Sequence, residues 1–305
     1  CGALSTPYAF DWDSDGDEDI LCGNTAGYIE FFENLSGVGS ETQWAAPVRL
    51  LAGGKPIRIQ AGPNGSIQGP CEAKWGYTTI SVGDWDHDGR HDIVANSIWG
   101  KVVWFRNVGS NTKPELTPAQ PVSLGNSNRR SEKPKWNWWN PSPGELVTQW
   151  RTTPYVVDWN EDGLNDLVML DHEGYLALYR RFEDNDGVLS LSTPQRIFVD
   201  ESMNPLRLND RLAGGSGRRK LAVADWDGDG RKDILINSVN ADWYRNDGER
   251  DGKTVLQHQG AIARRELSSH TTSPAVCDLN RDGKPDLLLG AEDGHLYYLP
   301  SARTQ

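Results

Sequence analysis

A ten-residue acidic segment occurs five times in the chain and carries its strongest chemical pattern. Every copy has Asp at positions 1, 5 and 9 and Gly at position 6, and position 3 is Asp or Asn. Carboxylates at alternate positions of a curled loop converge on one centre, and the glycine permits the sharp turn. The segment therefore has the donor spacing of a metal-binding loop. The copies are DWDSDGDEDI (11–20), DWDHDGRHDI (84–93), DWNEDGLNDL (158–167), DWDGDGRKDI (225–234) and DLNRDGKPDL (278–287).

The donor atoms of these loops favour calcium. About six to eight hard oxygen ligands suit Ca²⁺, whereas zinc prefers nitrogen and sulfur. Position 12 is never Glu and the flanking runs are strand-like, which excludes an EF-hand. We predict about five structural Ca²⁺ ions, held by side chains at positions 1, 3, 5 and 9 and by the backbone carbonyl of position 7. The predicted ligands are Asp11, Asp13, Asp15, Asp17, Asp19, Asp84, Asp86, Asp88, Arg90, Asp92, Asp158, Asn160, Asp162, Leu164, Asp166, Asp225, Asp227, Asp229, Arg231, Asp233, Asp278, Asn280, Asp282, Lys284 and Asp286.

Two other interpretations of the acidic segment are weaker. A charged turn without a cation would hold several carboxylates in mutual repulsion. A catalytic carboxylate pair is disfavoured because five near-identical catalytic sites in one chain have no purpose. Within the first copy, Glu18 is expected to face water. Position 2 is expected to pack between repeat units, and it is occupied by Trp12, Trp85, Trp159, Trp226 and Leu279.

Each acidic segment is embedded in the same pattern of strand-like runs. One run precedes it, as in TTISVG (78–83), and others follow, as in DIVANSI (92–98) and KVVWFRN (101–107). β-Branched and aromatic runs punctuated by Gly, Asn and Asp predict antiparallel strands. Four strands per unit predict an all-β fold, a β-propeller of four-stranded antiparallel blades that forms a single domain over 1–305. The units span about 1–51, 75–125, 150–200, 217–264 and 269–300.

The number of blades is left open by the fifth unit, which has three strand-like runs. In other units a fourth run follows, such as APVRLL (46–51), QPVSLG (120–125) and PQRIFV (194–199). The five units either close as a ring by themselves or form part of a larger ring, for example one with seven blades.

The acidic loops resemble the FG-GAP and VCBS calcium repeats, which occur in integrin α-subunit propellers and in many secreted bacterial proteins. The resemblance rests on the DxDxDGxxD core and covers essentially the whole chain. It implies a calcium-binding β-propeller. The chain is also similar to propeller polysaccharide lyases that act on uronic-acid polymers such as rhamnogalacturonan or ulvan. That similarity implies eliminative cleavage of an acidic polysaccharide.

The face opposite the calcium loops is the expected functional face. The residue seven positions before each loop begins the first strand of its blade and should surround one mouth of the central channel; these residues are Leu4, Tyr77, Arg151, Arg218 and Thr271. Aromatic rings stack on sugars, and Arg binds carboxylates through two parallel hydrogen bonds. The predicted substrate-binding residues are Trp75, Trp99, Trp136, Trp138, Trp139, Trp150, Arg218, Arg219 and Lys220.

Three classes of function are compatible with this face: an enzyme, a glycan-binding propeller and a protein-interaction propeller. Lyase chemistry requires a cation beside the uronate carboxylate, a base for the C5 proton and an acid for the leaving oxygen. The candidates are Arg151 and Arg218 as the cation, His270 or His172 as the base, and Tyr77 as acid or base. A glycoside hydrolase would need a carboxylate pair, for which Glu72 and Glu145 are available. The alternatives are a non-catalytic, lectin-like glycan-binding propeller and a protein-interaction propeller of the integrin α type.

The composition bears on the partners of the protein and on the compartment in which it acts. A formal charge of −12 argues against nucleic-acid binding, and no apolar run approaches the roughly 20 residues of a membrane span. Loops that require calcium suggest an extracellular or periplasmic protein. Cys22 and Cys277 lie in apolar strand patterns and are expected to be buried free thiols, whereas Cys1 and Cys71 could form a disulfide. The oligomeric state is left open by the sequence.

Overall fold

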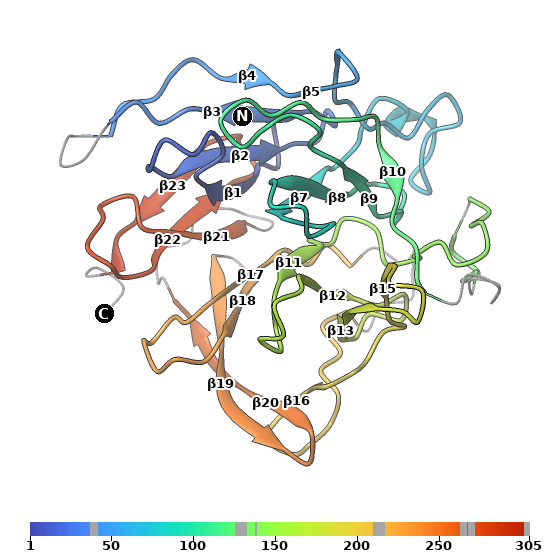
Figure 1. Cartoon of the computed structure of the whole chain (residues 1–305), viewed down its shortest axis with the longest axis vertical. Helices are drawn as coiled ribbons and strands as arrows, with labels where there is room; N and C mark the ends of the chain where they lie inside the picture. Colours follow the sequence, from blue (N-terminus) through green and yellow to red (C-terminus); the bar gives the residue numbers. More distant parts are fainter. Residues whose placement is uncertain are drawn as a thin grey trace.

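The computed structural model describes residues 1–36, 42–125, 133–137, 139–209, 217–238, 240–262, 267 and 272–301. Small antiparallel sheets follow one another around a central axis, as the colour gradient from blue to red shows in Figure 1. The fold is an all-β, five-bladed propeller arrangement. Within the described ranges the helical structure consists of one short 3-10 helix, η1 (Pro70–Glu72).

The first two blades each contain four antiparallel strands. Each blade runs from the central axis outward in chain order. Blade 1 comprises β1 (Thr6–Phe10), β2 (Asp19–Gly23), β3 (Ile29–Phe32) and β4 (Val48–Arg49). Blade 2 comprises β7 (Thr79–Gly83), β8 (Asp92–Asn96), β9 (Val103–Phe105) and β10 (Gln120–Pro121). A small hairpin between them is formed by β5 (Leu51–Ala52) and β6 (Lys55–Pro56).

The other three blades keep the same inner strands but differ at their outer edge. Blade 3 comprises β11 (Tyr155–Val157), β12 (Asp166–Leu170) and β13 (Leu176–Tyr179), followed by the hairpin β14 (Arg181–Glu183) and β15 (Leu189–Leu191). Blade 4 comprises β17 (Leu221–Ala224), β18 (Asp233–Asn237), β19 (Ala241–Arg250) and β20 (Lys253–Ala261). Blade 5 comprises β21 (Ser273–Cys277), β22 (Asp286–Gly290) and β23 (Leu296–Leu299).

The run 194–199 was expected to be the fourth strand of blade 3, and the structure divides it between two blades. Gln195 forms an isolated bridge with Leu178 of β13. The following strand, β16 (Phe198–Val199), pairs in parallel with β20 of blade 4. The long β19–β20 hairpin, at the bottom of Figure 1, reaches far enough to take up this strand. The run therefore joins blades 3 and 4.

The propeller closes with five blades. The inner strands β1, β7, β11, β17 and β21 contact one another in sequence, and β21 contacts β1. Between the first and last blades, the N–H of Leu4 donates to the carbonyl of Glu292 (3.2 Å). The carboxylate of Glu18 accepts a hydrogen bond from the N–H of Asp278 (2.6 Å). Glu18 therefore helps to close the ring, and the expectation that it faces water was wrong.

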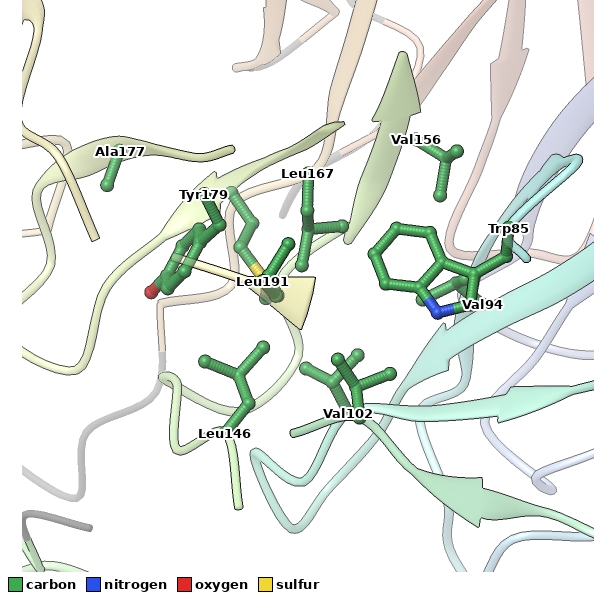
Figure 2. Packing of buried hydrophobic residues seen from close by; sticks show 11 residues of the cluster. Trp85, Val94, Val102, Leu146, Val156, Leu167, Ala177, Tyr179 and Leu191 are labelled. Carbon is green, nitrogen blue, oxygen red and sulfur yellow. The ribbon is translucent and has the colours of Figure 1, made fainter. Parts of the chain in front are cut away.

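Each blade interface contains an apolar cluster to which position 2 of an acidic loop contributes. Between blades 2 and 3, Trp85 packs with Val94 of β8 and with Val156 and Leu167 of blade 3, as Figure 2 shows. Trp12, Trp159, Trp226 and Leu279 belong to the clusters at the other four interfaces. The second strand of every blade is buried along its whole length. The prediction that position 2 packs between repeats is confirmed.

The cysteines pair differently from the sequence expectation. Cys1 forms a disulfide with Cys22, so the expectation of a free Cys22 was wrong, and the Cys1–Cys71 pairing that the sequence left open does not form. β2 places Cys22 beside the N-terminal segment, whereas Cys71 lies exposed in η1. Cys277 is a buried free thiol, as predicted. In the described part of the chain, no helix has the length and apolar character needed to cross a membrane.

Candidate functional site

The five acidic loops share one backbone conformation. Each lies between the first and second strands of its blade, at the same end of the ring. Position 6 is a glycine with φ between 77° and 99° in all five copies. Position 4 is also left-handed, with φ between 57° and 76°, although in four copies it is not glycine. The residues at position 4 are Ser14, His87, Glu161, Gly228 and Arg281.

The first aspartate of each loop holds the turn in place. In the second loop, Asp84 Oδ1 accepts from the N–H of Asp88 (2.9 Å) and its Oδ2 accepts from the N–H of Gly89 (2.9 Å). The same two bonds recur in the other four loops at 2.8–3.1 Å. The position-1 carboxylates therefore hold the loop backbone in the same turn in all five copies.

The aspartate at position 9 is fully buried and accepts backbone hydrogen bonds in every copy. Asp92, for example, accepts from the N–H of Trp85 (3.1 Å) and from the N–H of Asn107, just after the third strand (2.7 Å). Burial raises the pKa values of Asp19 and Asp92 to about 7, against the lowering effect of these bonds. Position 9 was predicted to complete the metal cage. Its clearest role in the structure is to connect the start of the second strand to the loop and to the third strand or the residues just after it.

Three of the five loops bring three carboxylates within reach of one cation. The acidic ligand atoms lie within 4.8 Å of one another in Asp11/Asp13/Asp15, Asp84/Asp86/Asp92 and Asp225/Asp227/Asp229. Asp13 Oδ1 and Asp86 Oδ1 are buried and have no hydrogen-bond partner among the described residues. A set of hard, negatively charged oxygens of this kind fits a divalent cation such as Ca²⁺. The two loops without such a triad have Asn160 or Asn280 at position 3.

Arginines within or just after the third strand enter two of these triads. Arg106 lies 2.6 Å from Asp86 and 3.0 Å from Asp88. Arg245 lies 2.8 Å from Asp227 in the fourth loop. Each of these arginines directly precedes the residue whose N–H donates to the position-9 aspartate. In blade 1 the donor is Asn34, and the residue before it is Glu33. The first triad therefore has an acidic neighbour where the other two have a guanidinium.

The opposite mouth of the central channel contains a cavity of about 460 Å³. The four described residues that lie seven positions before an acidic loop all line it, and all have positive φ: Leu4, Tyr77, Arg151 and Arg218. The N–H of Tyr77 donates to Thr25 and that of Arg151 to Ser97, which lie in turns of the preceding blade. The left-handed residue therefore connects each blade to its neighbour and directs a side chain toward the mouth.

A hydrogen-bonded group fixes the guanidinium of Arg151 on one wall of this cavity. The Arg151 guanidinium lies 3.2 Å from the centre of the Tyr77 ring, and the Tyr77 hydroxyl donates to buried Glu72 (2.8 Å). Burial, with Glu72 adding to it, raises the pKa of Tyr77 well above its ordinary value. Burial also lowers the pKa of Arg151 to about 10, so that it stays charged at neutral pH. Tyr77 and Glu72 thus position a permanent cation.

Other charged groups complete the cavity. Arg218 is exposed. The side-chain amide of Gln68 bridges two residues: its oxygen accepts from Arg218 (3.0 Å) and its nitrogen donates to Glu72 (3.0 Å). Lys220 lines both this cavity and the channel beneath it. Burial, together with the neighbouring Arg151 and Arg218, lowers the pKa of Lys220 to about 7. Glu292 is the acidic residue of the lining.

The channel below the cavity is almost closed. Its free volume is about 20 Å³, roughly enough for one water molecule. Tyr8 and Tyr155 from the inner strands line it, and their ring centres lie 5.7 Å apart. A ligand in the cavity therefore enters and leaves through the mouth.

The structure divides the predicted aromatic residues into two groups. Trp75 lines the cavity and is 40% exposed. The others belong to the supporting structure rather than the lining: Trp99, Trp136 and Trp150 pack with Tyr77 in an apolar cluster, and the indole N–H of Trp139 donates to the Trp99 carbonyl (2.8 Å). Trp138 lies outside the described residues.

Several predicted polar residues lie away from the lining. His172 occupies the turn after β12 and does not line the cavity. Arg219 donates to the backbone carbonyls of Leu208 (2.8 Å) and Asn237 (3.2 Å). Glu145 is buried in an ion pair with Lys101 (2.6 Å) and forms no carboxylate pair with Glu72 in the cavity. His270 and Thr271 lie outside the described residues.

Comparison with known proteins supports the repeat assignment. A family model described as an FG-GAP-like repeat matches residues 158–236 and 225–289, and the chain carries FG-GAP-like repeats in a β-propeller. No curated protein matches the chain.

Among solved structures, the chain is similar to a lectin from Agrocybe aegerita that recognises non-reducing terminal N-acetylglucosamine, at 15% identity and TM-score 0.40, covering 98% of this chain and 81% of that one. A GH43_1 enzyme from Xanthomonas citri shares 11% identity at TM-score 0.48, covering 97% and 86%. A GH43 β-1,3-galactosidase with galactodeoxynojirimycin shares 10% identity at TM-score 0.43, covering 98% and 94%.

Proposed function

We propose that this protein is a calcium-stabilised propeller that binds an acidic sugar unit of a glycan in the cavity at the channel mouth. The observation that carries the proposal is the juxtaposition of Arg151, Arg218 and Lys220 with the exposed indole of Trp75 in one cavity. Guanidinium groups bind carboxylates through paired, charge-assisted hydrogen bonds, and an aromatic face stacks on a sugar ring. The volume of about 460 Å³ lies within the range of small-ligand sites.

The charge balance of the cavity favours an anion. Arg151 is fixed against Tyr77 before any ligand arrives, so its orientation costs little on binding. Arg218 is exposed and available to a second carboxylate oxygen. The Cys1–Cys22 disulfide and the acidic loops also favour an oxidising, calcium-containing compartment outside the cytoplasm. An integrin-like scaffold function would leave this cationic cavity without a ligand.

The test measures binding with matched ligands and matched variants. Oligosaccharides of galacturonate, glucuronate and iduronate are titrated by calorimetry beside their carboxyl-reduced forms. We expect binding of at least one acidic series and at least about tenfold weaker binding of its reduced form, because a charge-assisted hydrogen bond contributes about 1.5–3 kcal/mol. Arg218→Ala should lose affinity by a similar factor.

The control variant is Arg207→Ala. Arg207 is also an exposed arginine beside a tyrosine ring, 5.3 Å from the centre of Tyr175, but it lies outside the cavity lining. It should bind the acidic sugar as the unmodified protein does. Equal affinity for acidic and carboxyl-reduced sugars, or an unchanged affinity in Arg218→Ala, would refute the proposed site.

A further inference from the structure

Lys220 occupies a distinctive place in the mouth cavity. Lys220 lines both the cavity and the narrow channel beneath it, as Thr6 and Ser273 also do. These three residues therefore form the cavity floor. Its backbone is fixed just before β17, because its N–H donates to Asn237 Oδ1 (2.9 Å) and its carbonyl accepts from the Asn237 N–H (2.9 Å). The stem of Lys220 therefore begins from a rigid position at the base of the site.

The charged groups that lower the pKa of Lys220 are all cations. They are Arg151, Arg218 and Arg219, whereas Glu292 is the acidic residue of the same cavity lining. Together with burial, which is the larger cause, they lower the pKa of Lys220 to about 7. Roughly half of the Lys220 side chains are therefore neutral amines at neutral pH, whereas Arg151 and Arg218 remain cations. The cavity combines cations for a carboxylate with a basic amine.

We propose that Lys220 is the base of an eliminative cleavage of the bound acidic glycan, and that it removes the C5 proton of the uronate unit in the mouth cavity. This inference rests on the proposed function, which places a uronate carboxylate against Arg151 and Arg218. Those guanidiniums stabilise the negative charge that develops on the carboxylate when the C5–H bond breaks.

The electrons and protons of the reaction balance within this site. The C5–H electron pair forms the double bond between C4 and C5, and the bond from C4 to the glycosidic oxygen breaks. The proton passes to the Lys220 amine, and the leaving oxygen takes a proton from water. The hydroxide formed recovers the proton of the Lys220 ammonium before the next turnover. No oxidant, reductant or further co-reactant is consumed.

Two other titratable groups at the cavity, Tyr77 and Glu72, are less suited to this step. The Tyr77 hydroxyl donates to Glu72, and its pKa is raised, so it does not act as a base at neutral pH. Glu72 is itself buried beneath Tyr77 and accepts from Ser66 as well. Both residues are positioning residues for Arg151. His172, a candidate base from the sequence, does not line the cavity.

The experiment follows product and binding separately. The uronic-acid oligosaccharides are incubated with the intact protein from pH 5 to 9, and the ultraviolet absorbance of the unsaturated uronate product is recorded. Because only the neutral amine accepts a proton, the rate should rise through about pH 7 and level off above it. Lys220→Met should lose at least about 100-fold of this rate, since general bases contribute about 10²–10⁴-fold. Its calorimetric affinity should change by less than the loss in Arg218→Ala.

The outcomes separate this inference from the function on which it depends. Binding of an acidic sugar without unsaturated product at any pH overturns the role of Lys220 and leaves the glycan site in place. Absence of binding overturns both. A Lys220→Met rate equal to that of the unmodified protein, or a pH profile with no rise through 7, also overturns the inference. Lys220→Gln serves as the second variant if Lys220→Met has a lower melting temperature than the unmodified protein.

Discussion

The two ends of the innermost strands differ in what the repeat preserves. At one end, every blade has an acidic loop with the same hydrogen bonds and the same left-handed turn. At the other end, the four blades in which this position is described again share a left-handed residue, but its side chain differs: Leu4, Tyr77, Arg151 and Arg218. The loop end therefore repeats one local structure in all five blades. The mouth end uses a repeated backbone to bring together unlike side chains, and only such a set can form a single asymmetric site.

The largest effect that this comparison predicts is the response to metal removal. Excess chelator should lower the melting temperature strongly, because each ion bound to the folded state contributes about 3–4 kcal/mol at roughly 100–1,000 times its dissociation constant. The three triads would account for most of this loss. Thermal unfolding in calcium and in chelator measures it. Coincident melting curves would show that the loops stabilise the ring without a cation.

The pH dependence in chelator sharpens the same prediction. Because burial raises the pKa values of Asp19 and Asp92 to about 7, the metal-free folded state binds protons more tightly than the unfolded chain does. Their contribution to stability is full below about pH 4 and is lost as the pH rises through 7. In chelator the melting temperature should therefore fall over this interval. In calcium the fall should be smaller, because the cation favours the charged carboxylates.

A pair of tryptophans tests whether stability and binding separate between the two ends. Trp85 is 3% exposed in the cluster between blades 2 and 3, whereas Trp75 is 40% exposed in the mouth cavity. Trp85→Ala should cost about 3–5 kcal/mol of unfolding free energy, as large-to-small core changes do. Trp75→Ala should cost less than about 1 kcal/mol and weaken acidic-sugar binding severalfold.

Denaturant unfolding and calorimetry on the two variants give the result. If Trp75→Ala destabilised the protein as much as Trp85→Ala, the mouth would be part of the core rather than a separate site.

The sequence predicted the features that depend on local spacing. Five copies of one loop implied the propeller and the packing of position 2 between blades, because both follow from a repeat that is visible in the chain. Counting seven residues back from each loop located Tyr77, Arg151 and Arg218 at the mouth, because a strand of fixed length connects the two ends.

Contacts between distant segments were not predictable in this way. The bond from Asp278 to Glu18 depends on closure of the ring, which brings the first and last blades together. The Cys1–Cys22 disulfide depends on the position of the N-terminal segment beside β2. The division of 194–199 between two blades depends on the length of the β19–β20 hairpin. The lowered pKa of Lys220 arises first from burial and then from Arg151 of the preceding blade and the chain neighbours Arg218 and Arg219. The burial and the approach of Arg151 depend on the folded ring, and no spacing in the sequence indicates them.

The loops themselves differ in one respect, which gives the smallest predicted effect. In the second loop, Arg106 contacts Asp86 and Asp88. In the first loop the corresponding residue is Glu33. Burial, Asp15 and Glu33 together raise the pKa of Asp13. A guanidinium in the triad competes with a metal ion for the same carboxylates. An added carboxylate instead strengthens the electrostatic attraction of the loop for a metal ion. The first loop should therefore bind calcium more tightly than the second.

Arg106→Gln tests this difference directly. Arg106 is 39% exposed, and an ion pair of this exposure contributes up to about 1 kcal/mol, so its loss should tighten calcium binding at the second loop by no more than about fivefold. The same change should lower the melting temperature in chelator. Arg180→Gln is the matched control, because Arg180 approaches Asp162 only to 3.7 Å in a loop that has Asn160 at position 3. Calcium titration calorimetry that found weaker binding in Arg106→Gln would mean that the arginine supports the metal-bound loop instead of replacing the ion.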